Sequence, residues 1–362
     1  MNRKFTAVDF FSGAGGLSLG LEKAGFTVAA AVEVNSEFTR TYRANHPYTH
    51  VLAKDIRQVT GEEILALTGL KEIHLVAGCP PCQGFSSLTS KYKKKDARND
   101  LLLEMARLIE EVKPKMVMLE NVPGLARRGK RILSQFVKRL EKLGYEINRD
   151  ILQLADYGVP QSRRRFVLLA GKGFRIPLPR QTHSRLGGKK NNLRPWLTLD
   201  RVIMGMKRPV TLSRAKRNGG PRKFGWHVVK DITEINRKRL KAVKPGESRY
   251  SLPVGLRPPC HANQKQGFQN VYGRMSWGQV PPTITSGCTT PCMGRFGHPR
   301  QIRTISVREA SLIQTFPKSY EFDTEFMDVA CDLIGNALPP KFARIVAKQC
   351  KKALLSHNED ME

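Results

Sequence analysis

The sequence predicts an α/β protein with a mostly parallel sheet, followed by a smaller, loop-rich second lobe. Three observations support this fold class: apolar segments that alternate with helical ones, a length of 362 residues, and a change of composition near residue 174. A chain of this length exceeds the usual domain of roughly 100–200 residues, so we expect two lobes. Strands that alternate with helices are typical of a parallel sheet covered on both faces.

The elements of the first lobe follow one another in a regular order. Five apolar segments have strand-like composition, at residues 5–11, 26–34, 74–78, 115–120 and 165–170. Helices are predicted at 17–24, 99–112, 306–315 and 341–354. In the second of these helices, Leu101, Met105 and Leu108 recur at the spacing of one helix face.

The second lobe is rich in glycine, proline, arginine and lysine between residues 175 and 300. It contains Trp196, Trp226 and Trp277, all the tryptophans of the chain, so we interpret it as a folded lobe and not a linker. We place the domain boundaries at 1–178 and 179–305, with 306–362 returning to complete the first domain.

Charge is concentrated in this lobe. The chain has 62 basic and 31 acidic residues, a net charge of +31. Residues 175–303 hold 27 Lys and Arg against 4 Asp and Glu, a net of +23, which leaves +8 for the rest. Such a field suits a polyanion, with nucleic acid first; an anionic membrane surface and a solubility pattern are the alternatives. Charge alone does not separate DNA from RNA.

Other features exclude several classes of protein. No apolar run approaches the ~18 residues of a membrane span, and the charged start is unlike a secretory signal. The seven cysteines show no disulfide rhythm, so we expect free thiols in a reducing compartment.

A glycine-rich turn, Asp9-Phe10-Phe11-Ser12-Gly13-Ala14-Gly15-Gly16, joins the first predicted strand to the first helix. Glycines let the backbone approach a ligand, and the helix start offers free N–H groups. Glu33 ends the next strand, where an acidic residue can hydrogen-bond a ribose. Together they favour a nucleoside cofactor, although glycine turns also occur for packing alone.

The segment Gly78-Cys79-Pro80-Pro81-Cys82-Gln83-Gly84 follows the third predicted strand. Its thiols could act as a nucleophile, a redox pair or half of a metal site, or be small buried groups. The prolines disfavour the helix that a thioredoxin-like pair opens. The other close pair, Cys288 and Cys292, lacks histidines at zinc-finger spacing, so we expect no metal.

Two polar motifs accompany the later strands. Glu120-Asn121-Val122 ends one of them, and a desolvated carboxyl group there can hold or donate a proton. In Gln161-Ser162-Arg163-Arg164-Arg165, strand alternation puts Arg163 and Arg165 on one face, which suits an anionic or carbonyl-bearing ligand. A capping carboxylate and a solvated basic patch are the alternative interpretations.

In this order, the motifs closely resemble the DNA (cytosine-5) methyltransferase family of the bacterial restriction-modification type. Three later motifs extend the resemblance from Val8 to about Leu354: Arg308-Glu309-Ala310, Gln314-Thr315-Phe316-Pro317 and Gly335-Asn336-Ala337-Leu338-Pro339-Pro340. It implies a Rossmann-like, S-adenosylmethionine-dependent methyltransferase domain with a mostly parallel mixed sheet, plus a smaller, loop-rich target-recognition domain.

The resemblance implies roles for individual residues. Cys82 is the expected nucleophile, Glu120 would hold cytosine N3 and the exocyclic amine, and Arg165, supported by Arg163, would contact cytosine O2. Cys79 stands where a small glycine is common, and we expect it to be a bystander. The expected cofactor contacts are Phe11, Gly13, Ala14, Gly16, Glu33, Asp55, Ile56, Pro81, Leu101 and Asn336.

DNA contacts are expected from the loop after Cys82 and from the basic lobe, which takes the target-recognition position. Arg274 and Arg295 are candidates to read bases, with phosphate contact or structural pairing the favoured alternative. The full set of expected DNA contacts is Ser86, Lys91, Lys93, Lys94, Arg98, Arg274, Thr283, Ile284 and Arg295.

The hypothesis is methyl transfer from S-adenosylmethionine to C5 of a flipped-out cytosine in a specific duplex DNA sequence. It proceeds through a covalent adduct of Cys82 with C6, leaves S-adenosylhomocysteine and uses no metal. Two alternatives stay open: an RNA cytosine-5 methyltransferase on this fold, and a non-catalytic DNA-binding regulator. We expect a monomer in the bacterial cytoplasm, associated with the nucleoid and without membrane contact. A restriction endonuclease is the expected functional partner, without direct contact.

Overall fold

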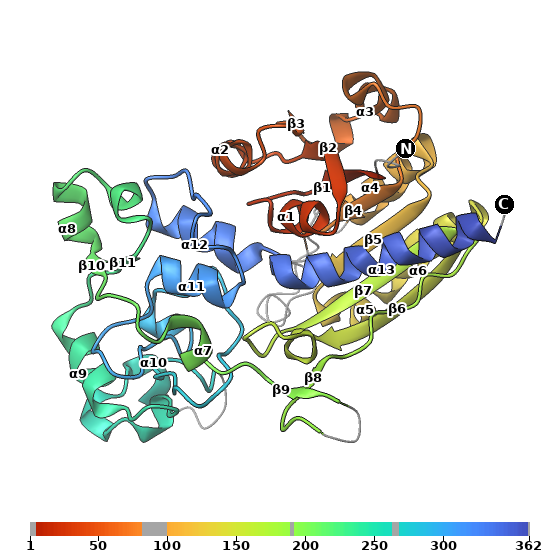
Figure 1. The fold of residues 1–362 in the computed structure, drawn as a ribbon. Coiled ribbons are helices and arrows are strands. Elements are labelled where there is room, and N and C mark those ends of the chain that lie inside the picture. The colour runs from red at the N-terminus through yellow and green to blue at the C-terminus, as the bar shows by residue number, and fades with distance from the viewer. Residues whose placement is uncertain (1–4, 82–99, 189–191, 263–267, 361–362) are drawn as a thin grey trace. The chain divides into compact units, whose positions relative to one another are not determined.

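The computed structural model describes residues 5–81, 100–188, 192–262 and 268–360. The chain divides into two compact units (Figure 1). Unit 1 comprises Met1–Tyr157, Arg164–Thr182 and Leu338–Glu362, and unit 2 comprises Gly158–Arg163 and His183–Ala337.

Unit 1 is built on a seven-stranded sheet with the strand order β3-β2-β1-β4-β5-β7-β6. The first five strands in this order are parallel, while β7 runs antiparallel to both β5 and β6. The strands are β1 (Phe5–Phe10), β2 (Phe26–Val32), β3 (His50–Leu52), β4 (Leu75–Gly78), β5 (Met116–Asn121), β6 (Tyr145–Gln153) and β7 (Arg164–Lys172). The predicted mostly parallel α/β fold is therefore confirmed.

Helices cover both faces of this sheet, because the connections leave the centre in opposite directions, from β1 to β2 and from β4 to β5. Figure 1 shows α1 and α13 in front of the sheet, with α4 and α6 behind it. The helices of unit 1 are α1 (Gly16–Lys23), α2 (Ser36–Asn45), α3 (Gly61–Thr68), α4 (Leu101–Val112), α5 (Pro123–Arg127), α6 (Lys130–Lys142) and α13 (Pro340–Glu359).

The last helix completes the fold of the first residues. Helix α13 packs along α1, and at Gly20 a Cβ would come within 2.3 Å of the Ala343 Cβ, so only glycine permits this approach. On the other face, α4 and α6 bury an apolar stripe that includes Met105, Leu108 and Phe136 in the main core. The core thus fixes β1, β4 and β5, whose ends carry the predicted site.

Unit 2 contains short elements joined by long loops, as the composition predicts. Its strands form two parallel pairs, β8 (His183–Ser184) with β9 (Arg194–Pro195) and β10 (Val210–Thr211) with β11 (Val228–Val229). Its helices are α7 (Asp200–Ile203), α8 (Leu212–Arg217), α9 (Glu234–Ala242), α10 (Pro259–Ala262), α11 (Val307–Ile313) and α12 (Met327–Asn336).

The boundaries of the two units differ from the predicted ones in a specific way. Residues 306–337 pack with unit 2, and only 338–362 return to unit 1. The reason lies in buried contacts: Trp226 Nε1 donates to the Phe322 carbonyl (2.9 Å), and Arg308 Nε donates to the Gly225 carbonyl (2.7 Å). Residues 158–163 also belong to unit 2, although they lie within the predicted first domain.

Candidate active site

The predicted site residues of unit 1 follow one edge of its sheet. Parallel strands bring their carboxyl ends to the same edge, and ligands of open α/β sheets bind there, where the strand order reverses. Here the reversal lies between β1 and β4. The residues that follow the parallel strands at this edge are Phe11–Gly16 after β1, Glu33 after β2, Asp55 after β3, Cys79–Pro81 after β4, and Glu120 near the end of β5.

The turn after β1 has a backbone shape that depends on its glycines. Phe11, Gly13 and Gly15 all have positive φ angles, of 61°, 53° and 81°. A Cβ placed on Gly13 would meet no atom within 4 Å, so open space lies beside the turn. Gly16 begins α1, which presents its first N–H groups here, and Ala14 is buried. The turn therefore offers backbone donors and room for a ligand.

Glu33 is tied to this turn. Its Oε2 accepts the Gly13 N–H and its Oε1 accepts the Asn35 N–H, both at 2.9 Å. Burial raises the pKa of Glu33 above its usual value, and the two N–H donors act against this rise. Val34, which directly follows Glu33, is an apolar side chain that is 65% exposed.

The other predicted cofactor residues of unit 1 differ in accessibility. Ile56 and Leu101 lie in the main core, at 3% and 9% exposure, so they can offer only an edge to a ligand. Asp55 caps the short helix at Ile56–Gln58 by accepting the Arg57 N–H (2.9 Å). Pro81 is partly exposed after β4. Their roles in cofactor binding stay predictions.

Asp9, inside β1, carries a buried polar network that the sequence analysis did not single out. It is 0% exposed; its Oδ2 accepts the Ser18 hydroxyl (2.6 Å), which also contacts the Tyr42 hydroxyl (2.7 Å). Asp9 Oδ1 and the Ser12 hydroxyl have no partner within the described chain. These two unpartnered, buried polar atoms beside the turn fit a bound polar group. An aspartate in an otherwise apolar strand was the available signal.

Asp9→Asn is expected to stabilise the protein at pH 8. Burial raises the pKa of Asp9 from 3.8 to about 7. Between these values the folded state keeps a proton that the unfolded state has released, so stability falls as pH rises and stays low above pH 7. Asparagine removes this cost, on the order of 2–4 kcal/mol, and still accepts from Ser18. Urea unfolding at pH 5 and pH 8 measures it, with exposed Asp150→Asn as control. A mutant that keeps the wild-type pH slope would contradict the assignment.

Glu120 and Arg165 form a pair at the far side of the same edge. Arg165 Nε lies 2.7 Å from Glu120 Oε1, and the two side chains are only 13% and 9% exposed. The direction of the N–H makes this an ion pair and not an aligned hydrogen bond. Asn121 Nδ2 donates to the Pro80 carbonyl (3.1 Å), which joins the end of β5 to the segment after β4. The Glu120 carboxylate, the Arg165 guanidinium and the segment that precedes Cys82 therefore lie at the same edge of the sheet.

Part of the predicted site lies outside the described residues. This holds for the nucleophile and for the expected DNA contacts of the following loop: Cys82, Ser86, Lys91, Lys93, Lys94 and Arg98. Pro81 is the last described residue before them, so their roles stay predictions.

The structure corrects the view that Arg163 and Arg165 act from one strand face. Strand β7 begins at Arg164, and Arg163 belongs to unit 2. Arg163 is 2% exposed and donates to the carbonyls of Ile284 (2.8 Å) and Gly335 (3.1 Å). These contacts assign Arg163 to holding unit 2 together rather than to touching a base.

Two further expected DNA contacts of unit 2 are also engaged within it. Ile284 is 0% exposed, and its N–H donates to Gln161 Oε1 (3.2 Å), so its side chain presents nothing to DNA. The Thr283 hydroxyl donates to the Ser162 carbonyl (2.5 Å). Asn336, the expected cofactor contact of unit 2, is exposed at the end of α12.

Arg274, a candidate to read bases, is buried. The residue is 7% exposed, and its guanidinium donates within unit 2 to the carbonyls of Leu240, Val243, His298 and Pro299. Arg295 is partly exposed and donates to the Gly246 carbonyl (2.9 Å). A guanidinium that donates to backbone carbonyls has few N–H groups left for a base. The contacts of Arg274 and Arg295 therefore favour a structural role over base reading.

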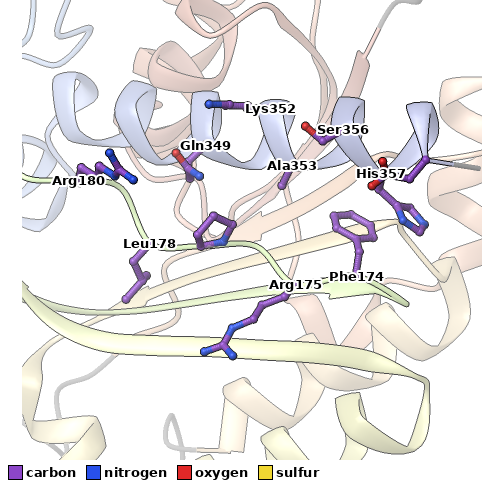
Figure 2. Close-up of a pocket in the computed structure, with 11 residues that line it drawn as sticks. Phe174, Arg175, Leu178, Arg180, Gln349, Lys352, Ala353, Ser356 and His357 are labelled. Carbon is purple, nitrogen blue, oxygen red and sulfur yellow. The ribbon is translucent and has the colours of Figure 1, made fainter.

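A separate open cavity of about 690 Å³ lies elsewhere in unit 1, between the segment after β7 and helix α13 (Figure 2). Phe174 stacks on His357 at one end, with ring centres 4.6 Å apart, and Arg180 and Gln349 lie toward the other end. None of the predicted cofactor or catalytic residues lines it. The described ranges contain no group of three metal-ligating side chains and no helix suited to crossing a membrane.

A doubly wound sheet with a glycine turn after its first strand and an acidic residue after the second is typical of α/β enzymes that use a nucleoside cofactor. The model of the C-5 cytosine-specific DNA methylase family matches residues 5–352. The chain belongs to this family, and it is a DNA (cytosine-5)-methyltransferase of the restriction-modification type.

The relatives support this placement. The chain is 36% identical over 354 residues to the type II methylase M.HgiDII of Herpetosiphon aurantiacus, covering 96% of this chain and 95% of that protein. It is 31% identical to the type II methyltransferase M.XorII of Xanthomonas oryzae pv. oryzae, with 96% and 84% covered. A solved prophage-encoded protein of E. coli shares the fold, with a TM-score of 0.73 at 22% identity over 97% of this chain and all of that one.

Proposed function

We propose that this protein transfers a methyl group from S-adenosylmethionine to C5 of a flipped-out cytosine in a specific duplex DNA sequence, through a covalent Cys82–C6 adduct. The observation that carries the proposal is the shared sheet edge. The glycine turn after β1 and the Glu120–Arg165 pair lie on either side of the segment that leads to Cys82, and this arrangement supports the proposal. When bound, S-adenosylmethionine supplies an electrophilic methyl group on a sulfonium.

The residues of this chain have separate tasks in that reaction. Cytosine C5 is a poor nucleophile until a thiolate adds to C6, so Cys82 forms the S–C6 bond and makes C5 electron-rich. Glu120 holds N3 and the exocyclic amine, and Arg165 holds O2, which stabilises the charge that moves into the ring. After C5 takes the methyl group it loses its proton, and the electrons of that bond expel the thiolate.

The remaining parts of the proposal concern the DNA. The reacting atoms are unreachable in a stacked duplex, so the base must leave it at a cost of a few kcal/mol. Cations in the loop after Cys82, such as Lys93 and Arg98, are proposed to hold phosphates. Base reading falls to unit 2, by residues other than the buried Arg274. The type II names of the relatives support a role in protecting DNA from a paired endonuclease.

Duplex DNA that contains 5-fluorocytosine is expected to trap the protein covalently. The fluorine at C5 cannot leave as a proton does, so the adduct accumulates after methyl transfer. A DNA-sized shift of the protein on a denaturing gel, dependent on S-adenosylmethionine, measures it. Active enzyme that fails to trap would contradict addition at C6.

The same preparation separates the alternative functions. With labelled S-adenosylmethionine and matched duplex DNA and RNA, label should enter 5-methylcytosine in DNA alone. Label only in RNA would favour the RNA methyltransferase, and binding without any label would favour the regulator.

A further inference from the structure

A cluster of exposed cations lies in unit 1, outside the basic lobe. It occupies the turn from α5 into α6, and we call it the α5–α6 cluster. Its members are Arg127, Arg128, Lys130 and Arg131. Between Glu120 and Glu141 the sequence has six basic residues and no acidic one, so the field around this turn is strongly positive.

The cluster lies at the sheet edge that carries the candidate site. Helix α5 follows the end of β5, where Glu120 lies, and α6 then runs back to the opposite edge. There β6 begins, since Tyr145 of β6 and Met116 of β5 pair with adjacent residues at the end of β7. Arg127 follows Glu120 by seven residues, of which five form α5. A helix rises only ~1.5 Å per residue, so their Cα atoms lie within about 16 Å of each other.

Buried neighbours fix the backbone of the cluster. Leu125 is 0% exposed, and the N–H groups of Arg128 and Gly129 both donate to the Gly124 carbonyl, at 2.8 and 3.2 Å. Phe136 buries one face of α6 in the main core. The charged side chains are therefore held at the surface by a packed support, which suits a binding site.

These positions are unfavourable for the protein itself. The side chains of Arg127, Lys130 and Arg131 have no hydrogen-bond or ion-pair partner within the described ranges. Helix α6 has no acidic residue in its first turn, and its N-cap is Gly129. A helix N-terminus carries partial positive charge, so the dipole of α6 repels Lys130 and Arg131. Cations that oppose local stability and have no internal partner fit an anion outside the protein.

We propose that the α5–α6 cluster binds the DNA backbone beside the target cytosine. This inference rests on the proposed function, which puts the flipped cytosine at Glu120. One strand of a duplex has one phosphate per ~3.4 Å of axis, so about 16 Å corresponds to about five base pairs. The cations can thus contact phosphates close to the target and hold the duplex on unit 1, without reading its sequence. The cluster is a third DNA contact, beside the loop after Cys82 and the basic lobe.

The test compares two variants with the same loss of charge. The cluster variant carries Arg127→Gln, Lys130→Gln and Arg131→Gln. Arg128 is left in place, because it has another interaction within the chain. The control variant removes three exposed cations at the opposite edge of the sheet, by Lys113→Gln, Lys142→Gln and Lys172→Gln. Affinity for a labelled duplex of mixed sequence is measured by fluorescence anisotropy at several salt concentrations, together with the Tm.

The cluster variant is expected to bind DNA ~100-fold more weakly at ~0.1 M salt, because each lost phosphate contact releases fewer counterions. The slope of log affinity against log salt concentration should become shallower by about 0.9 per contact, or ~2.7 in all. Its Tm should equal or exceed that of the wild type, since repulsion at the start of α6 is relieved. The control should bind within ~3-fold of wild type, because charges at the far edge are screened.

An undiminished affinity, an unchanged salt slope, or an equal loss in the control variant would overturn the proposal. A lower Tm in the cluster variant would assign these cations to the fold and would overturn it as well. Wild-type protein that binds duplex DNA but methylates none would refute the proposed function instead, because the affinity measurement does not depend on methyl transfer.

Discussion

Cys82→Ser is expected to lower methyl transfer by ~10³-fold or more while S-adenosylmethionine still binds, because the variant loses its nucleophile and keeps its cofactor turn. A free thiol has a pKa near ~8.5 and reaches the thiolate form with modest help from its surroundings, whereas a serine hydroxyl does not. The cofactor contacts expected from Gly13 and Glu33 belong to other strands and should be unaffected.

The measurement pairs transfer of label to DNA with cofactor titration by calorimetry. Cys350→Ser, a buried cysteine of α13, serves as the control and should transfer normally. Transfer by Cys82→Ser near the wild-type rate would refute the nucleophile assignment. A loss of cofactor binding would instead show that the variant disturbs the fold of the edge.

Arg163→Met and Arg165→Met are expected to fail in different ways, although the two arginines are two positions apart. Arg163→Met leaves the buried carbonyls of Ile284 and Gly335 without this donor, which should cost about 2–5 kcal/mol of the stability of unit 2. Arg165→Met should leave that stability unchanged and slow methyl transfer by ~10²-fold, because Glu120 loses its cation.

Tryptophan fluorescence separates the two effects, because all three tryptophans lie in unit 2. Urea unfolding followed by this signal should shift to lower urea in Arg163→Met and stay in place in Arg165→Met. An unshifted transition in Arg163→Met, together with lost turnover, would restore Arg163 to the catalytic role that the sequence predicts.

Helices and strands could be predicted from the sequence where their buried faces produce a clear pattern of apolar residues. Strands β1, β4 and β5 are buried on both faces and appear as apolar runs, and α4 shows a clear helical repeat. Strand β6 was missed because it is an edge strand whose pattern mixes exposed and buried residues. Helix α6 was missed although Leu133, Phe136 and Leu140 already show its buried face.

The candidate site could also be predicted only in part. Residues after parallel strands could be grouped from the sequence, because topology alone brings those ends to one edge. The contacts of Arg163 and Arg274 could not be predicted, because the sequence does not show whether an arginine binds a ligand or a carbonyl group far away in the chain.

The contact between Arg163 and Gly335 cannot form until late in the synthesis of the chain. The two residues are 172 positions apart, so at 5–20 residues per second Arg163 is synthesised about 10–30 s before its partner. Helix α13, which completes the packing of α1, is made later still. A nascent chain stopped before residue 335 would therefore expose a cation and an apolar helix face that the finished protein buries. We expect such truncated chains to require chaperones, because unit 2 is incomplete until residue 337 has been made and unit 1 is incomplete until α13 has been made.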